Sequence, residues 1–260
     1  MGKFFTVEVK PDIVNGDIST VIDSDKSHLD IGARDLIFDW TEVLIPKGGC
    51  MLRSITAIVN AEDGAYNTNQ LTDYHLYFAK SVNGVAPTTM GLTNAVQTAC
   101  FDLKDHFVGC VILQSAQSTG TTAGTAFHVA YHANEDSVTG GGFPVVIDLD
   151  PASSSMGYDK LYVCGFQIAL RGYQTGVIVN GAITSDTEDT IAVDGVAATK
   201  IFSVGDTVYL HDVDTALGTI KSLTDTSIVL NAAIAGGTDL ADDDELVNAN
   251  PIKMLLGFER

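Results

Sequence analysis

The sequence predicts an all-β protein: a jelly-roll-like β-sandwich with a small β-barrel inserted before its last strand. Three observations predict this fold class. Short β-branched and aromatic runs, punctuated by turn signals, recur along the 260 residues. No long helical period runs through the chain. The composition shifts near Gln174, where the runs become shorter and differently spaced, and one more apolar strand follows this segment.

Eight candidate strands precede the change. Each is a short run in which β-branched, aromatic or aliphatic residues dominate. They are residues 4–9, 36–45, 52–60, 73–80, 107–114, 126–132, 144–149 and 161–170. Asp63-Gly64 and Asn83-Gly84 stand between or beside these runs, and both dipeptides tolerate the positive φ of tight hairpins. Residues 93–104 are the one stretch considered for a helix.

Eight or nine strands of this kind favour two sheets packed face to face. Such a sandwich buries one face of each sheet and needs only hairpin and crossover connections. A jelly roll is the expected topology, and an immunoglobulin-like sandwich is the alternative.

The segment 174–250 predicts a second, smaller unit. Its candidate strands are residues 177–179, 190–193, 207–210, 218–222, 227–230 and 245–247. Asn180-Gly181 and Asp194-Gly195 supply hairpin turns. The runs 204–210, 218–220 and 228–230 resemble those of an SH3-like or related small β-barrel, so we expect such a barrel here.

The apolar run 251–258 follows this unit and predicts another strand. We expect it to pair with the run 161–170, so that the barrel is an insertion between the last two strands of the sandwich. The expected domains are then residues 1–173 with 251–260, and residues 174–250. Closing a flexible loop of this length costs about 4 kcal/mol, and a folded insert with adjacent ends costs less. Pro251 would mark the return to the sandwich.

The charge balance excludes some partners. Thirty-three acidic residues face fourteen basic ones, for a formal net charge of −19. Thirteen of the acids and only two of the bases lie in residues 174–250. Such a chain repels phosphate backbones and anionic bilayers, so we expect neither nucleic acid nor a membrane as partner. The sequence has no run of 18 consecutive apolar residues, so it predicts no transmembrane helix.

The four cysteines are Cys50, Cys100, Cys110 and Cys164. None is spaced as a metal pair or a redox Cys-x-x-Cys motif. Cys110 and Cys164 stand inside apolar runs. We therefore expect free, buried thiols, which suits folding in a reducing cytoplasm.

No catalytic, cofactor-binding or metal-ligating residue emerges from the sequence, and we expect no enzyme. His128 and His132 would face one side of a strand about 13 Å apart, too far for one zinc ion. The acidic cluster at Asp239 and residues 242–245 lacks the spacing and glycine of a calcium loop, so we expect a solvated loop. A catalytic triad or a pair of catalytic carboxylates, assembled from residues far apart in the sequence, stays an alternative.

Trp40 admits two interpretations. Lectin-like sandwiches stack sugars on exposed aromatic rings. Strand alternation, however, places Trp40 on the same face as Phe38, which favours a role in the core or between the sheets.

The run Phe38-Asp39-Trp40-Thr41-Glu42 followed by residues 43–49 and 52–55 resembles virion structural proteins of tailed bacteriophages, especially marine and cyanobacterial ones. Residues 3–9 and 76–81 fit the same resemblance. It implies a protein located in the virion and assembled in the cytoplasm of a bacterial host.

Within that family we expect a capsid decoration or cement protein that binds the outside of the head and stabilises it. Its partners would be the major capsid protein or other virion proteins, and it would form a homo-oligomer, with a trimer favoured. It would need no cofactor. A tail or fibre component is the alternative, and a carbohydrate-binding module is the alternative of another class.

Overall fold

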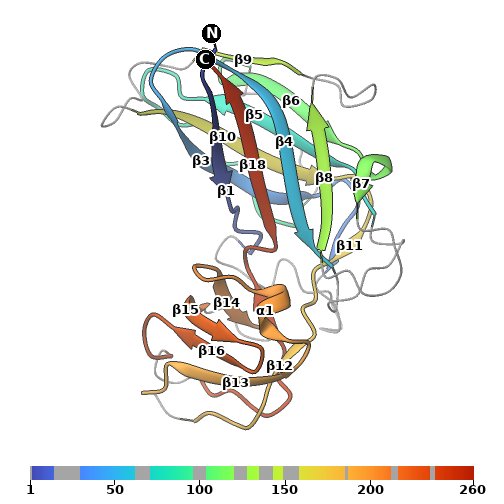
Figure 1. The fold of residues 1–260 in the computed structure, drawn as a ribbon, viewed down its shortest axis with the longest axis vertical. Coiled ribbons are helices and arrows are strands. Elements are labelled where there is room, and N and C mark those ends of the chain that lie inside the picture. The colour runs from blue at the N-terminus through green and yellow to red at the C-terminus, as the bar shows by residue number, and fades with distance from the viewer. Residues whose placement is uncertain are drawn as a thin grey trace.

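The computed structural model describes residues 2–14, 30–61, 71–95, 104–119, 128–134, 143–148, 158–184, 187–211, 216–234 and 238–260. Antiparallel strands dominate them, and the helices among them are the short α1 (Ala198–Ile201) and a 3-10 turn at Ser115–Gln117. The predicted all-β class is confirmed. Figure 1 shows a sandwich that holds both chain ends, above a smaller barrel.

The first sheet of the sandwich has six antiparallel strands. In spatial order five of them are β1 (Phe4–Val9), β18 (Ile252–Glu259), β4 (Cys50–Asn60), β8 (His128–Asn134) and β7 (Ser118–Thr119). The sixth, β9 (Val145–Ile147), pairs with the beginning of β4. Alternate residues of β18 are buried, which is the pattern of a strand with one face on a core.

The second sheet has four antiparallel strands and lies across the core from the first (Figure 1). In spatial order they are β3 (Leu36–Pro46), β10 (Tyr158–Gln167), β5 (Tyr74–Lys80) and β6 (Phe107–Leu113). A short pair, β2 (Asp30–Ile31) and β11 (Arg171–Gly172), stands apart from both sheets. The main hydrophobic core fills the space between the sheets.

The partner predicted for the last strand is wrong. β18 lies between β1 and β4, where Met254 faces Val9 on one side and Ala57 on the other. β10 belongs to the opposite sheet, between β3 and β5. Apolar composition shows that a strand is buried but does not choose its neighbour, because any strand with a matching apolar face can pair with it.

The barrel is a six-stranded antiparallel sheet. Its spatial order is β12 (Val177–Val179), β13 (Thr190–Gly195), β16 (Ser227–Leu230), β15 (Ala216–Thr224), β14 (Thr207–Leu210) and β17 (Leu246–Asn248). The sheet nearly closes on itself, because the Val179 N–H donates to the Asp244 carbonyl at 2.8 Å and the Asp243 N–H to the Val179 carbonyl at 2.9 Å. The barrel has a core of its own, which includes Ile191 and Ile220.

The barrel lies between β11 and β18 in the chain, and its sheet is separate from the two sheets of the sandwich. The domain boundaries at residues 174 and 250, and the folding of the sandwich without the barrel, stay predictions.

Phe38 and Trp40 do not share a face, contrary to the prediction. Phe38 lies in the main core, whereas Trp40 packs outside it with Cys164 and Phe166. Strict alternation fails because the register between β3 and β10 shifts beside Gly165. Such a bulge turns the following residue to the other side of the strand.

The prediction of buried thiols holds for Cys50 and Cys164 and is wrong for Cys110. Cys110 is exposed on β6, opposite Tyr77. The next residue, Val111, points into the core, so the apolar run around Cys110 belongs to a strand with two different faces. Cys100, the Asp63-Gly64 turn and most of the stretch 93–104 lie outside the described residues.

Candidate functional site

His132 and the barrel carboxylates make contacts within the protein, and the side chain of His128 lies outside the described part of the structure. His132 is exposed on β8, and its Nδ1 lies 2.9 Å from the Thr56 hydroxyl oxygen. Within the described residues, no group of three or more His, Cys, Asp or Glu side chains could hold a metal ion. None of the helices in the described part of the chain has the length and hydropathy needed to cross a bilayer.

The acidic cluster at the end of the barrel sequence closes the barrel. The Glu245 carboxylate accepts the backbone N–H groups of Thr175 at 2.8 Å and Gly176 at 3.1 Å. Asp242 accepts the Gly181 N–H at 2.7 Å. These bonds satisfy backbone donors of the chain entering and leaving β12, so the carboxylates stabilise turns.

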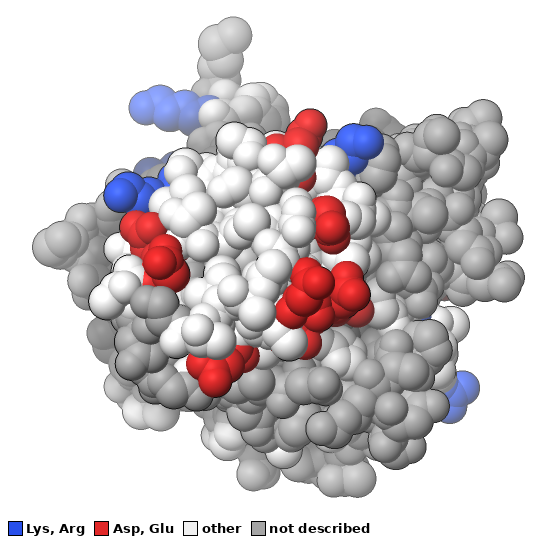
Figure 2. Space-filling view, turned by 90° about the horizontal axis from the view of Figure 1, so that it is seen from below, with Lys and Arg blue, Asp and Glu red and all other residues white. Residues whose placement is uncertain are grey.

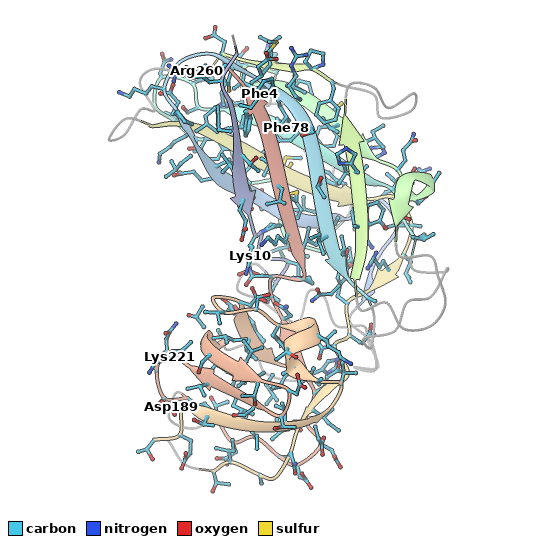
Figure 3. The ribbon with its side chains drawn as sticks, viewed as in Figure 1. Phe4, Lys10, Phe78, Asp189, Lys221 and Arg260 are labelled. Atoms are coloured by element: carbon cyan, nitrogen blue, oxygen red, sulfur yellow. The ribbon has the colours of Figure 1, made fainter. Side chains whose placement is uncertain are left out.

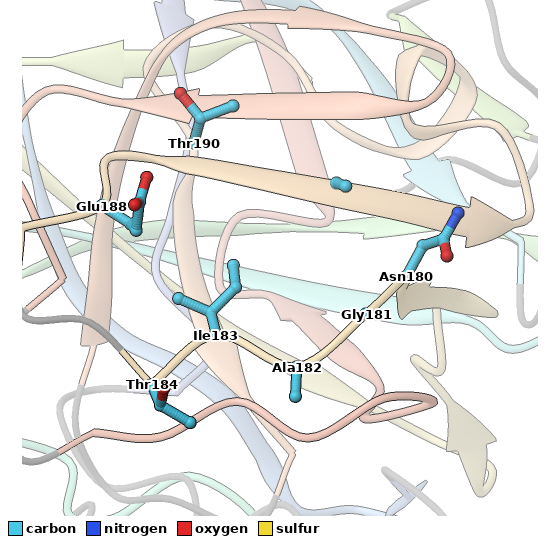
Figure 4. A pocket seen from close by; sticks show the side chains of 8 residues that line it. Asn180, Gly181, Ala182, Ile183, Thr184, Glu188 and Thr190 are labelled. Carbon is cyan, nitrogen blue, oxygen red and sulfur yellow. The ribbon is translucent and has the colours of Figure 1, made fainter.

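The barrel also carries a shallow groove of about 390 Å³ (Figure 4). It lies between the segment after β12 and the beginning of β13. Its lining is Asn180, Gly181, Ala182, Ile183, Thr184, Glu188, Thr190 and Ala192. An amide, two hydroxyls and one carboxylate beside a small apolar patch could bind a neutral, hydroxylated ligand. The lining offers no aromatic ring on which a sugar could stack.

The surface around this end of the molecule is anionic. Glu188, Asp189, Asp194, Asp242 and Asp243 are all exposed on the barrel. Figure 2, which views the molecule from below, shows several Asp and Glu groups around an uncharged area, with few Lys or Arg side chains. An anionic ligand would be repelled from this end.

A polar contact joins the sandwich to the barrel at Asp206. Its carboxylate is only 4 % exposed and accepts from Lys10 Nζ at 2.8 Å, the Ser203 N–H at 2.8 Å and Asn248 Nδ2 at 3.2 Å. Figure 3 shows Lys10 where the chain leaves β1 towards the barrel. These three donors offset the cost of removing the Asp206 carboxylate from water, and one of them, Lys10, comes from the sandwich.

Apolar contacts continue the same junction. Tyr209, Val247 and Ala249 come from the barrel sequence but belong to the sandwich core. The Ile13 N–H donates to the Ala249 carbonyl at 2.8 Å. The two units thus share a buried interface, not only a pair of linkers.

A buried arginine lies at the end of the sandwich near this junction. Arg171 is 1 % exposed, its guanidinium lies 5.5 Å from the centre of the Tyr173 ring, and Nη1 is 3.4 Å from the Tyr131 hydroxyl. Nη2 donates to the Asn60 carbonyl. Tyr131, on the first sheet, contacts Tyr74, on the second, edge to face at 5.0 Å. The cluster therefore ties both sheets to the chain that leads into the barrel.

The cluster stays cationic at neutral pH. Burial acts to lower the pKa of Arg171, but Tyr74, Tyr173 and Tyr131 act in the other direction, and its pKa is raised overall. Burial raises the pKa of Tyr173 to about 12 and also raises the pKa of Tyr74 and Tyr131. Sequence reasoning missed this group. The one signal was a lone Arg directly after the strongly apolar run 161–170.

The outer side of the second sheet carries several aromatic side chains and a leucine, where a face turned to solvent usually carries polar ones. We call it the aromatic face and define it by Trp40, Leu44, Tyr77, Phe107, Tyr162 and Phe166. Leu44 and Tyr162 each stand between two residues of the main core, so they point outwards. Tyr77 packs against Phe166 at 5.4 Å and against Phe107 at 6.2 Å between ring centres.

Part of the aromatic face is covered by its own chain. Met90 packs on Leu36, Cys164 and Phe166, and the Trp40 indole N–H donates to the Thr88 carbonyl at 3.0 Å. Leu44 is 47 % and Phe107 is 44 % exposed, whereas Tyr162 and Phe166 are buried at 8 % and 9 %.

Comparison with protein-family models, with curated proteins and with solved structures finds no match for this chain.

Proposed function

We propose that this chain is a structural protein of a tailed-bacteriophage particle and that it decorates the outside of the head. The observation that carries the proposal is the order of the eight long strands. Numbered along the chain, they run 1-8-3-6 in the first sheet and 2-7-4-5 in the second. We interpret this interlocked order as a jelly roll, an architecture found in viral capsid and lectin domains.

The charge supports an external position. A net charge of −19 is unfavourable beside packaged DNA, where the phosphates would repel the protein. The exposed acids at the free end of the barrel fit a surface that faces solvent (Figure 2). The resemblance of residues 38–55 to virion structural proteins points to the same class.

The protein would act by bridging capsid subunits. Each contact can be modest, because a symmetric oligomer on a closed shell repeats it many times and gains avidity. Contacts made by an anionic protein should be mainly apolar and hydrogen-bonded, unless the shell presents a basic patch. Binding should then survive moderate salt, which already screens most long-range attraction.

The test is co-sedimentation of the purified protein with phage heads that lack it. We expect the protein to sediment with the heads at moderate salt and to raise the temperature at which they open. Heads that already carry the protein are the matched control and should bind little more. Protein that stays in the supernatant would remove the decoration proposal, and binding to tails alone would support the tail alternative.

A carbohydrate-binding role is the second candidate, favoured by the groove between residues 180 and 192. Its amide and hydroxyl groups fit a neutral glycan, whereas Trp40 is half-buried and already bonded to Thr88. A glycan array would test it. Binding that is lost in Thr190→Val and kept in Trp40→Phe would support the groove, and an empty array would remove this candidate.

A further inference from the structure

The groove on the barrel lies where the pairing of two strands stops. β12 and β13 pair side by side, and the last bond between their chains joins the Asn180 N–H to the Ala192 carbonyl at 2.9 Å. Beyond that bond, no backbone hydrogen bond between described residues joins the two chains. The groove begins at this point, with residues 182–184 on one side and Glu188 and Thr190 on the other (Figure 4).

Strand geometry directs the backbone of Thr190 into the groove. In an antiparallel sheet, successive residues turn their N–H and C=O groups towards opposite neighbours. Asp189 bonds to β16, since its carbonyl accepts the Leu230 N–H at 2.7 Å, whereas the Ala192 carbonyl bonds towards β12. Thr190 lies two residues before Ala192, so its N–H and C=O point to the same side as those of Ala192. On that side Thr190 meets the groove instead of a paired strand.

The opposite wall presents backbone groups in the same way. Both backbone groups of Ile183 bond away from the groove, because its N–H donates to the Leu240 carbonyl at 2.8 Å and its carbonyl accepts the Leu240 N–H at 2.9 Å. By the same alternation, the backbone groups of Ala182 and Thr184 face β13 across the groove. The Ile183 side chain packs against the barrel core between the two walls (Figure 4).

Open backbone groups at this spacing favour an extended peptide as the occupant. The unpaired N–H and C=O groups of a strand edge are a template on which another extended chain can form hydrogen bonds. The wall at residues 181–184 covers about 13 Å at the rise of a strand, which is the length of about four peptide residues. A glycan has hydroxyl groups but no regular alternation of donor and acceptor at the spacing of a strand.

The charges around the groove favour a basic peptide. Glu188 lines the groove, and the Asp242 carboxylate lies at its margin, where it accepts the Gly181 N–H at 2.7 Å. Residues 174–250 carry thirteen acids and two bases, and neither base lines the groove. An acidic peptide would therefore be repelled, whereas a Lys or Arg side chain would be attracted.

We propose that this groove binds an extended, basic segment of a partner protein, which pairs through its backbone with Thr190 and the opposite wall. In this mode of recognition, backbone bonds give affinity and the side chains of the added strand give specificity. A Lys or Arg of the partner would lie beside Glu188. The site goes beyond the proposed function, because it does not depend on the protein coating a head. A neutral glycan is the competing occupant.

The first measurement is a titration of the full chain with the blocked pentapeptide Thr-Lys-Val-Lys-Thr, followed by NMR of the backbone amides. We expect shifts at Ala182, Thr184 and Thr190, and slower hydrogen exchange of the Thr190 N–H. The Ile191 N–H, which faces β16, should change little.

Two control peptides separate backbone pairing from charge. Methylation of the three central backbone nitrogens keeps both positive charges but removes donors, and should weaken binding about tenfold. Replacement of both lysines by glutamates keeps the backbone but reverses the charge, and should abolish the shifts.

The second measurement repeats the titration with two charge variants of the protein. Glu188→Lys should raise the dissociation constant of the basic pentapeptide about fivefold, and the matched Asp194→Lys less than about twofold. Both carboxylates are exposed, and the two variants change the net charge equally, but Asp194 does not line the groove.

Failure of the basic pentapeptide to bind up to millimolar concentration overturns the proposal. So does equal binding of the methylated or the glutamate peptide, or an equal effect of the two charge variants. Shifts of the same amides by maltopentaose, without any by the peptide, would overturn it in favour of a glycan. Phage heads take no part in these assays, so their outcome is separate from that of the co-sedimentation test.

Discussion

At the residue scale, Gly165 and Phe38 show how one position shapes the core. The Phe38 ring lies directly over Gly165, where the register between β3 and β10 shifts, and a Cβ on Gly165 would overlap that ring. Gly165→Ala should therefore lower the free energy of unfolding by about 1–3 kcal/mol. Urea unfolding measures it. Gly49→Ala is the matched control, because its added Cβ meets only an ordinary contact at 3.6 Å. Equal losses for the two variants would contradict the packing described here.

Tyr173 makes the free energy of unfolding depend on pH in the alkaline range. Burial raises its pKa to about 12, above the ordinary value of 10.0. Between these values the unfolded chain loses the proton and the folded chain keeps it. The contribution to stability is therefore complete below pH 10 and is lost as the pH rises towards 12, by up to about 3 kcal/mol.

Urea unfolding below pH 10 and between pH 10 and 12 tests this linkage. The decline should be shallower in Tyr173→Phe, which has no proton to lose. Tyr74 and Tyr131 titrate in the same direction, so part of the slope should remain. An identical slope in the variant would show that Tyr173 does not couple folding to pH.

At the scale of elements, the sequence located strands far better than it located their neighbours. β1, β12, β14 and β16 have the predicted bounds, because alternating apolar residues and flanking turns define a strand locally. The partner of β18 was missed because pairing depends on residues far apart in the chain. The face of Trp40 was missed because a register shift beside Gly165 leaves no local signal other than the glycine.

The candidate sites were less predictable than the strands. The expectation that His128 and His132 hold no metal stays a prediction. The Asp206 carboxylate could not be foreseen as a junction residue, because its partner Lys10 is 196 positions away. Cys110 was misassigned because an apolar run does not show which of its residues point away from the core; Cys110 is exposed whereas Val111 is buried.

The Lys10–Asp206 pair should be worth more than an ion pair on an open sheet face. Lys10→Met removes one of three donors to a carboxylate that is 4 % exposed, and should cost about 1.5–3 kcal/mol. Lys253→Met breaks the Lys253–Glu8 pair, whose side chains are 40 % and 47 % exposed, and should cost less than about 1 kcal/mol. Thermal unfolding compares them. A reversed ranking would show that Asp206 does not couple the units.

At the scale of the whole molecule, the insertion predicts that the sandwich can fold without the barrel. Replacing residues 174–250 by a short Gly/Ser linker keeps β1 to β11 and β18. The shortened chain should unfold cooperatively but at a lower temperature, because it loses the core contacts of Tyr209, Val247 and Ala249. Calorimetry measures this. A soluble shortened chain without a cooperative transition would mean that the two parts form one folding unit.

We propose that this protein coats a phage head from outside. Electron cryomicroscopy of heads incubated with the purified protein would image that position. We predict extra density at regular lattice positions on the outer surface, with a sandwich and a smaller barrel in each copy. Density confined to the tail, or heads identical with and without the protein, would contradict the claim.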